Sequence, residues 1–165
     1  MTISLSIEPL AAAHDRSRFN CGVESLDRYL QKQAGQDMKR RIAHIFVASP
    51  PDKPKQVLGY YSLSSLSIEL RHLPETLVRK LPKHPIPAAL IGRLAVAKTA
   101  QGQGIGGILL ADAIKRTLAV SEQIAIYAMV VDALNDKARK FYEQFGFIRF
   151  GDDSRRLFLP LKSIR

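Results

Sequence analysis

The sequence predicts a single mixed α/β domain built around a central sheet. Its 165 residues are 46% hydrophobic and 24% charged, which is typical of one globular domain with a substantial core. Apolar runs of strand length recur along the chain, and in the second half they alternate with two longer segments of helical periodicity. Several strands followed by the order strand–helix–strand–helix–strand indicate a sheet flanked by helices.

The first half of the chain predicts one helix among several strands. Apolar and polar residues alternate at 3–7, whereas Val23, Leu26 and Leu30 recur at helical spacing. A proline-containing connector at 49–55 separates two apolar runs and makes them a hairpin candidate. The expected elements are a strand at 3–7, a helix over about 22–40 that is broken near Gly35, and strands at 42–48 and 57–68.

The second half predicts strands and helices in alternation. Four prolines between 69 and 87 indicate a loop with at most a short helix at 74–81. Gly146 stands where a helix ends, and Gly151 with two aspartates marks the last turn. The expected elements are strands at 88–97 and 124–131, helices at 104–120 and 135–145, and a final pair of strands near 147–150 and 155–159.

The formal net charge of +10 favours a polyanionic partner, such as nucleic acid, an acidic protein or a phosphate-rich ligand. A basic surface that serves solubility alone is the alternative. Lys and Arg are spread along the chain rather than gathered in one tail. Any basic face must therefore be assembled by folding.

Composition also argues against several classes of protein. The one cysteine, Cys21, rules out an internal disulfide and suits a reducing cytoplasm. The first residues lack the features of a signal peptide, and no apolar stretch is long enough to span a bilayer. The histidines and the cysteine show no ligand spacing, so we expect no metal site.

The most informative segment holds four glycines directly ahead of the helix expected at 104–120. They are Gly102, Gly104, Gly106 and Gly107. Successive glycines let several backbone N–H groups turn toward one point, and a helix that begins there adds the positive end of its dipole. The segment therefore predicts an anion cradle, most often one for phosphate.

Two nucleotide-binding interpretations of this segment fail on its surroundings. The pattern G-x-G-x-x-G matches formally, and Asp132 stands where a ribose-binding acid would. However, residues 97–101 separate the strand from the first glycine, and only 33 residues follow Asp132, too few for the remaining parallel strands. A P-loop requires Lys and then Ser or Thr after the last glycine, where this chain has Ile108 and Leu109.

A third interpretation rests on two motifs in a fixed order. The pattern Gln-x-x-Gly-x-Gly formed by Gln101, Gly104 and Gly106 resembles the acetyl-CoA diphosphate loop of the GNAT superfamily of N-acetyltransferases. Residues 135–147 are similar to the second landmark of that family, Asn-x-x-Ala-x-x-Phe-Tyr followed by Gly-Phe. The resemblance covers roughly 88–160 well. It implies a single N-acetyltransferase domain over 1–165, whose mixed, mostly antiparallel sheet is splayed at the acetyl-CoA site.

The resemblance also implies how acetyl-CoA would be held. Backbone N–H groups of the glycine segment would cradle the diphosphate, and the end of the preceding strand would pair with the pantetheine arm. The same strand end would donate an N–H group to the thioester oxygen. Asn135 would contact the arm, and by its residue type it is also a helix N-cap. The residues expected to bind acetyl-CoA are Leu94, Ala95, Val96, Gln101, Gly102, Gln103, Gly104, Ile105, Gly106, Gly107 and Asn135.

Tyr142 is the expected catalytic residue. A phenol with a pKa of about 10 can protonate a leaving thiolate whose conjugate acid has a pKa of about 8.5. Tyr142 lies one position from an apolar stripe formed by Ala138, Phe141 and Phe145. We therefore expect its ring to border the core while its hydroxyl points into a cleft, with a purely packing role as the alternative.

A narrower resemblance appears in two segments. Residues 84–96 are similar to the signature Pro-x-Pro…Arg-Leu-Ala-Val, and residues 19–30 to the helix opening Phe-x-Cys-Gly-x-x-x-Leu-Asp, of a GNAT subclass. That subclass comprises toxins of type II toxin–antitoxin systems, which acetylate the amino group of aminoacyl-tRNA and stop translation. The resemblance implies a cytoplasmic homodimer with a ribbon-helix-helix antitoxin. Ala97 departs from the pattern, since relatives often carry Asp there.

Arg93, the arginine of that signature, is the candidate for contact with tRNA. An arginine inside an apolar strand is costly unless it reaches a polar cleft or a partner. It either meets tRNA or pairs with a carboxylate at the strand edge. The basic segment 71–83 is a second candidate for a substrate-facing loop, or is simply solvated.

No strong general base stands out, with Glu8 and Glu69 as unsupported candidates. An α-amino group, with a pKa of about 7.7–8.0, is partly neutral near pH 7 and needs none, whereas a lysine at about 10.4 would need help. Two alternatives to the tRNA-acetylating enzyme stay open. One is a GNAT enzyme that acts on a protein N-terminus, a lysine or a small amine. The other is a non-enzymatic nucleic-acid-binding module, although the sequence contains no helix-turn-helix or other recognisable nucleic-acid-binding motif.

Overall fold

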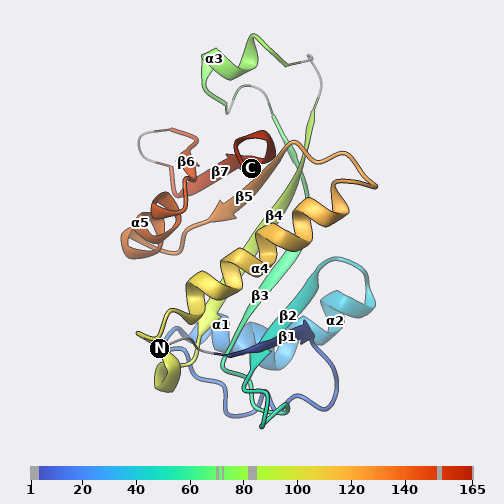
Figure 1. Cartoon of the computed structure of the whole chain (residues 1–165), viewed down its shortest axis with the longest axis vertical. Coiled ribbons are helices and arrows are strands. Elements are labelled where there is room, and N and C mark those ends of the chain that lie inside the picture. The colour runs from blue at the N-terminus through green and yellow to red at the C-terminus, as the bar shows by residue number, and fades with distance from the viewer. Residues whose placement is uncertain (1–3, 70, 72, 82–84, 152–153, 165) are drawn as a thin grey trace. The chain divides into compact units, whose positions relative to one another are not determined.

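The computed structural model describes residues 4–69, 71, 73–81, 85–151 and 154–164. Among these residues, seven strands are hydrogen-bonded in the order β1-β2-β3-β4-β5-β7-β6 (Figure 1). The strands are β1 (Ser6–Pro9), β2 (His44–Ser49), β3 (Gly59–Ile68), β4 (Ile86–Val96), β5 (Ala128–Asp132), β6 (Ile148–Arg149) and β7 (Arg156–Pro160). The α-helices are α1 (Glu24–Arg28), α2 (Ala34–Lys39), α3 (Glu75–Val78), α4 (Ile105–Val120) and α5 (Asp136–Gln144).

The pairing of the strands confirms the predicted mixed, mostly antiparallel sheet. Strands β1 and β2, β2 and β3, β5 and β7, and β6 and β7 pair antiparallel. Strands β4 and β5 pair parallel, which requires a crossover, and α4 supplies it. The predicted hairpin is thus β2–β3, with Val47 opposite Tyr60.

The chain divides into two compact units, each of which has its own core. Unit 1 comprises Met1–Ser64 and Gly92–Lys115, and unit 2 comprises Ser65–Ile91 and Arg116–Arg165. The core of unit 1 packs the helical segment after Val23 against β2 and β3, with Leu30, Ile45 and Val47 fully buried. The core of unit 2 gathers side chains of β4, β5 and β7, among them Ala128, Val130 and Phe158. Exclusion of these apolar side chains from water stabilises each unit.

The helix expected over 22–40 is interrupted just before the predicted position, and Gly35 itself lies inside α2. A π-helical turn at Tyr29–Gln33 separates α1 from α2. Its geometry is set by the N–H group of Ala34, which donates to the carbonyl of Tyr29 five residues back. The widened turn carries two consecutive buried side chains, Tyr29 and Leu30. Packing against the sheet, rather than the local weakness of glycine, therefore decides where the helix departs from α geometry.

Most other predicted elements are confirmed with shifted ends. The strand expected at 124–131 begins only at Ala128, because residues that follow α4 form a turn in which Ile124 is 66% exposed. Strand β1 starts at Ser6, and the predicted residue 3 lies outside the described residues. The short helix expected within 74–81 is α3. Gly146 ends α5 with φ of 95°, as predicted for a glycine at a helix C-terminus.

None of the helices formed by the described residues has the length and apolar character that a membrane span requires.

Candidate active site

The glycine segment forms a turn that leads from a 3₁₀ turn at Lys98–Ala100 into α4. Gly102 and Gly104 have φ angles of 81° and 82°, in the left-handed region that favours glycine. A Cβ atom added to either residue would meet no atom within 4 Å. The space beside the turn is therefore open, and backbone conformation alone requires glycine at these two positions.

The first turn of α4 presents backbone donors beside this open space. The N–H group of Ile108 donates to the carbonyl of Gly104 at 3.2 Å, so Gly104 stands at the start of the helix. The N–H groups of Ile105, Gly106 and Gly107 precede that bond and have no acceptor within the helix. Together with the positive end of the helix dipole, these donors have the arrangement that an anion cradle requires.

The side chain of Gln101 fixes the base of the glycine turn. Its Nε2 donates to the carbonyl of Val96 and to the carbonyl of Cys21, both at 2.9 Å. The first bond ties the turn to the end of β4, and the second ties it to a loop 80 residues earlier in the chain. Both amide hydrogens of Gln101 are thus used within the protein, which makes the side chain a positioning group for the turn.

Strand β4 extends beyond its parallel partner. The register of β4 with β5 runs from Ala88 opposite Ala128 to Ile91 opposite Val131, whereas β4 continues to Val96. Leu94, Ala95 and Val96 belong to this last stretch. A strand that outruns its neighbour leaves N–H and C=O groups along that edge, as an added extended chain requires.

Arg93 lies in the same stretch of β4 and is half-buried. Its guanidinium carbon is 3.6 Å from the centroid of the Tyr29 ring, a cation–π contact. In the described part of the chain Arg93 forms no ion pair, so the alternative of a carboxylate-paired arginine is not what the structure shows there. A stacked guanidinium keeps its N–H edge available for an acceptor.

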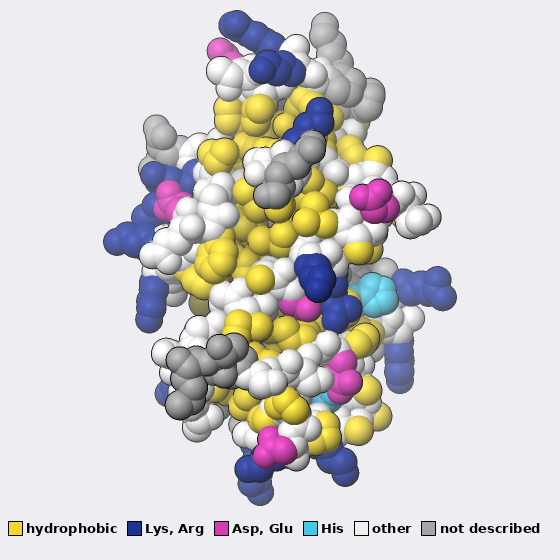
Figure 2. All heavy atoms as spheres, in the orientation of Figure 1, with side chains coloured by type: hydrophobic (Ala, Val, Ile, Leu, Met, Phe, Trp, Pro, Cys, Tyr) yellow, Lys and Arg dark blue, Asp and Glu magenta, His cyan; other side chains and the backbone are white. Residues whose placement is uncertain are grey.

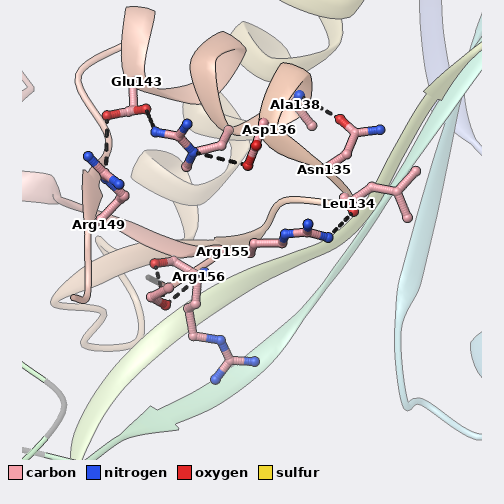
Figure 3. Close-up of polar contacts among 10 residues, drawn as sticks. Leu134, Asn135, Asp136, Ala138, Glu143, Arg149, Arg155 and Arg156 are labelled. Atoms are coloured by element: carbon pink, nitrogen blue, oxygen red, sulfur yellow. Dashed lines mark hydrogen bonds and ion pairs between the residues drawn. The ribbon is translucent and has the colours of Figure 1, made fainter. Parts of the chain in front are cut away.

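Asn135 caps α5, in unit 2. Its side-chain oxygen accepts a hydrogen bond from the N–H group of Ala138 at 2.9 Å, the N-cap geometry (Figure 3). The capping role predicted from its residue type is thereby confirmed. The amide nitrogen of the same side chain is not engaged by this bond.

Arginine side chains fix the segment between β5 and α5. Arg156 donates from Nε to Oδ1 of Asp132 at 2.7 Å and from Nη2 to Oδ2 at 2.9 Å. Arg155 donates to the carbonyl of Leu134 at 2.9 Å. Asp132, the ribose-binding acid of the discarded dinucleotide interpretation, is thus a structural partner of Arg156. Figure 3 shows the bond from Arg155 to Leu134 together with the ion pairs of Asp136, Glu143 and Arg149.

Tyr142 is the buried residue of α5, with 5% of its surface exposed. Its ring lies edge-to-face against Phe147 and Phe141, with centroids 5.7 Å and 5.3 Å away. Burial raises the pKa of the Tyr142 hydroxyl above its usual value, and the negative charge of Asp132 acts in the same direction. The hydroxyl therefore keeps its proton at neutral pH.

The prediction that Ala138, Phe141 and Phe145 form the inward-facing stripe of α5 is wrong. Ala138 and Phe141 are only partly buried and Phe145 is 39% exposed, whereas Tyr142 faces inward. In a helix, a shift of one residue rotates the inward face by about 100°. The period of the pattern was sufficient to predict a helix, but the face that packs inward depends on the strands that it meets.

The carboxylates considered as general bases are both paired. Glu8 accepts from Nε2 of the buried His14 at 2.8 Å, and Glu69 pairs with Arg71 at 2.6 Å. Within the described residues, no group of three or more His, Cys, Asp or Glu side chains is arranged to hold a metal ion.

Sequence reasoning missed Tyr29 and its neighbours on the helical segment. Tyr29 donates from its hydroxyl to Asp37 at 2.6 Å, and Gln33 donates to the same carboxylate at 3.0 Å. The spacing of four between these polar residues was a usable signal, because side chains four apart share one face of a helix. Nothing local indicates that Arg93 packs on that face, because it comes from a strand 64 residues later in the chain.

The sequence and fold were compared with known proteins. The family model of the acetyltransferase (GNAT) domain matches residues 41–149. A tRNA-acetylating toxin of Mycobacterium tuberculosis is 36% identical over 156 residues, which cover 94% of this chain and 92% of that protein.

Solved structures agree with this match. The toxin AtaT complexed with acetyl-methionyl-tRNA superposes with a TM-score of 0.89 at 36% identity, over 98% of this chain and 97% of that one. A Tyr-to-Phe variant of AtaT, bound to acetyl-CoA and to the C-terminus of the antitoxin AtaR, superposes with a TM-score of 0.83 at 34% identity, over 97% and 95%. The open glycine turn and the extension of β4 beyond β5 agree with these matches. The chain belongs to the GNAT family of acetyltransferases.

Proposed function

We propose that this protein transfers the acetyl group of acetyl-CoA to the amino group of aminoacyl-tRNA. The observation that carries the proposal is the glycine turn at the start of α4, with open space beside Gly102 and Gly104 and free N–H groups on the first helical turn. The acceptor is supported by similarity to a tRNA-acetylating toxin and to AtaT in complex with acetyl-methionyl-tRNA.

In this proposal, residues 1–165 are a single N-acetyltransferase domain. The N–H groups of Gly102–Gly107 bind the diphosphate, and Gln101 holds the turn in place through Val96 and Cys21. The backbone of Leu94, Ala95 and Val96 pairs with the pantetheine arm as an added strand. Asn135 contacts the arm with the amide nitrogen that its capping bond leaves over.

The neutral amine attacks the thioester carbon, and an N–H group at the end of β4 stabilises the oxyanion that forms. The C–S bond then breaks, and the Tyr142 hydroxyl gives its proton to the leaving thiolate. The ammonium that results from the attack loses a proton to water, and Tyr142 regains one. An α-amine with a pKa of about 7.7–8.0 needs no dedicated base, which agrees with the pairing of Glu8 and Glu69 within the protein.

Arg93 binds the acceptor RNA with the guanidinium edge that the Tyr29 stack leaves available. Lys and Arg side chains lie at the surface (Figure 2), and the net charge of +10 favours contact with a polyanion. We further propose that the enzyme is a cytoplasmic homodimer, and that it stops translation until a ribbon-helix-helix antitoxin neutralises it. Similarity to AtaT bound to AtaR supports the antitoxin.

Transfer of a radiolabelled acetyl group tests the acceptor directly. The purified protein is mixed with labelled acetyl-CoA and, in separate reactions, with aminoacyl-tRNA, deacylated tRNA, a lysine-containing peptide or a polyamine. Aminoacyl-tRNA whose amino group is already formylated is the matched control. We expect label only on the free-amine aminoacyl-tRNA, recovered as N-acetyl amino acid after ester hydrolysis. Label on the peptide or polyamine alone would support the alternative GNAT activity instead.

A further inference from the structure

Three loops of unit 1 line an open cavity of about 840 Å³ that the proposed acetyl transfer does not use. The loops contribute residues from Asp15 to Asn20, from Lys53 to Val57 and from Ala97 to Thr99. The volume lies within the range of about 300–1,000 Å³ that is usual for small-molecule sites.

Main-chain hydrogen bonds hold the walls of this cavity in place. The N–H group of Asp15 donates to the carbonyl of Lys55, and the N–H group of Lys98 donates to the carbonyl of Asn20, both at 2.8 Å. Each bond joins two different loops of the wall. The cavity is therefore formed before any ligand arrives, so binding need not supply the cost of ordering it.

The rim of the cavity is positively charged. Four of its side chains are exposed cations, and none of them takes part in an ion pair formed by the described residues: Arg18, Lys53, Lys55 and Lys98. The one carboxylate among the lining residues, Asp15, accepts hydrogen bonds from the N–H and hydroxyl groups of Ser17. Cations gathered around one space repel each other, and an anion placed there relieves that repulsion.

The floor of the cavity is apolar. Phe19 and Val57 line it with 5% and 6% of their surfaces exposed, and Pro54 is also among the lining residues. An apolar floor under a cationic rim matches a ligand with a flat, weakly polar part and a phosphate. A peptide of acidic residues would place its carboxylates well, but its backbone would find few polar partners on this floor.

We propose that this cavity binds a nucleoside phosphate, with the base on the floor at Phe19 and Val57 and the phosphate between Lys53, Lys55 and Arg18. The nucleotide belongs either to the tRNA substrate or to a free mononucleotide. The tRNA source rests on the proposed function, whereas nucleotide binding itself rests on the cavity alone. Because the wall at Ala97–Thr99 runs directly into Gln101, an occupant here would sit beside the residues that anchor the glycine turn.

Binding measurements without turnover test the cavity separately from the enzymatic activity. The double variant Lys53→Gln/Lys55→Gln is compared with a matched double variant, Lys115→Gln/Lys140→Gln, which removes the same charge from exposed helical positions outside the cavity. The probes are deacylated tRNA, 5′-AMP, a hexa-aspartate peptide and acetyl-CoA. Circular dichroism and thermal unfolding show whether each variant folds.

If the cavity binds a tRNA nucleotide, Lys53→Gln/Lys55→Gln weakens tRNA binding at least about 10-fold. It also makes the slope of log K against log salt concentration less steep by about one unit per lysine. The control variant shows neither effect. If the occupant is a free nucleotide, 5′-AMP binds the wild type and loses affinity only in the cavity variant. Equal effects in both variants would overturn the proposal, as would equally tight binding of the peptide or a parallel loss of acetyl-CoA affinity. Failure of acetyl transfer with intact nucleotide binding would refute the proposed function alone.

Discussion

The hydroxyl of Tyr29 donates a hydrogen bond of 2.6 Å to Asp37, two turns further along the same helical segment. This bond fixes the ring on which the guanidinium of Arg93 is stacked. Gln33 donates to the other oxygen of Asp37 at 3.0 Å, so the carboxylate is held from two sides. The position of Arg93 is thus determined by a helix that is distant in sequence and not by a carboxylate beside it on the strand.

Replacing Arg93 by Lys tests whether RNA binding needs the shape of the guanidinium or only its positive charge. Arg93→Lys keeps the positive charge but loses the flat guanidinium and its paired N–H donors. We expect the KM for aminoacyl-tRNA to rise about 10-fold, with little change in the KM for acetyl-CoA. Steady-state kinetics with each substrate varied in turn measures both constants. A rise in both KM values to the same extent would indicate loss of fold rather than of an RNA contact.

Tyr29→Phe is the companion to that change, because it keeps the ring and removes only the bond to Asp37. We expect the free energy of unfolding to fall by about 1 kcal/mol, the usual net contribution of a hydrogen bond, while the KM for aminoacyl-tRNA changes little. Denaturant titration gives the stability. Loss of RNA binding as large as in Arg93→Lys would show that the Asp37 bond, and not the ring, positions the arginine.

Tyr142→Phe removes one oxygen from a buried ring that packs on Phe141 and Phe147. Because a positioned general acid contributes about 100-fold or more, we expect kcat to fall by at least that factor, with the KM for acetyl-CoA nearly unchanged. Tyr127→Phe, elsewhere in unit 2, is the matched control and should retain full activity. A kcat for Tyr142→Phe equal to that of the wild type would exclude the proton-donor role.

Two glycine substitutions are expected to affect two different properties, the affinity for acetyl-CoA and the free energy of unfolding. Gly104 has a φ of 82°, so Gly104→Ala is strained by about 1–2 kcal/mol and weakens acetyl-CoA binding, although no atom stands in the way of the added carbon. Gly35 lies inside α2, where its added carbon would meet only ordinary contact with Arg16, so Gly35→Ala raises the free energy of unfolding by up to about 1 kcal/mol. Calorimetry measures both quantities. Equal acetyl-CoA affinities for the two variants would argue against the cradle.

Stability should decline in acid in a way that depends on Asp37. The hydrogen bond from Tyr29, and then that from Gln33, hold the pKa of Asp37 below its usual value of 3.8. A carboxyl group whose pKa is lowered by folding stabilises the protein above its unfolded pKa, and that contribution is lost as the pH falls through the folded pKa. Thermal unfolding between pH 5 and pH 2 should therefore show a smaller loss in Asp37→Asn than in the wild type. Parallel pH curves for the two proteins would contradict this.

Motifs that act through the backbone could be predicted from the sequence alone. The start of α4 after the glycines, the cap at Asn135 and the end of α5 at Gly146 are all confirmed. Each depends on conformational preferences of a few neighbouring residues: left-handed φ angles for glycine and a short polar side chain at a helix start. The break predicted near Gly35 lies slightly earlier, at Tyr29–Gln33, where Tyr29 and Leu30 are buried.

The sequence by itself determined the order of the elements, the glycine turn between Gln101 and Gly107, and the resemblance that made Tyr142 a candidate acid. The tertiary structure alone decided which face of α5 points inward, that Gln101 is held by the carbonyl of Cys21, and that Arg93 stacks on Tyr29. The physical reason is the range of the interactions. A turn or a cap is settled within about four residues. A buried face or a stacked cation depends on partners that only the folded chain brings together, and no local pattern encodes them.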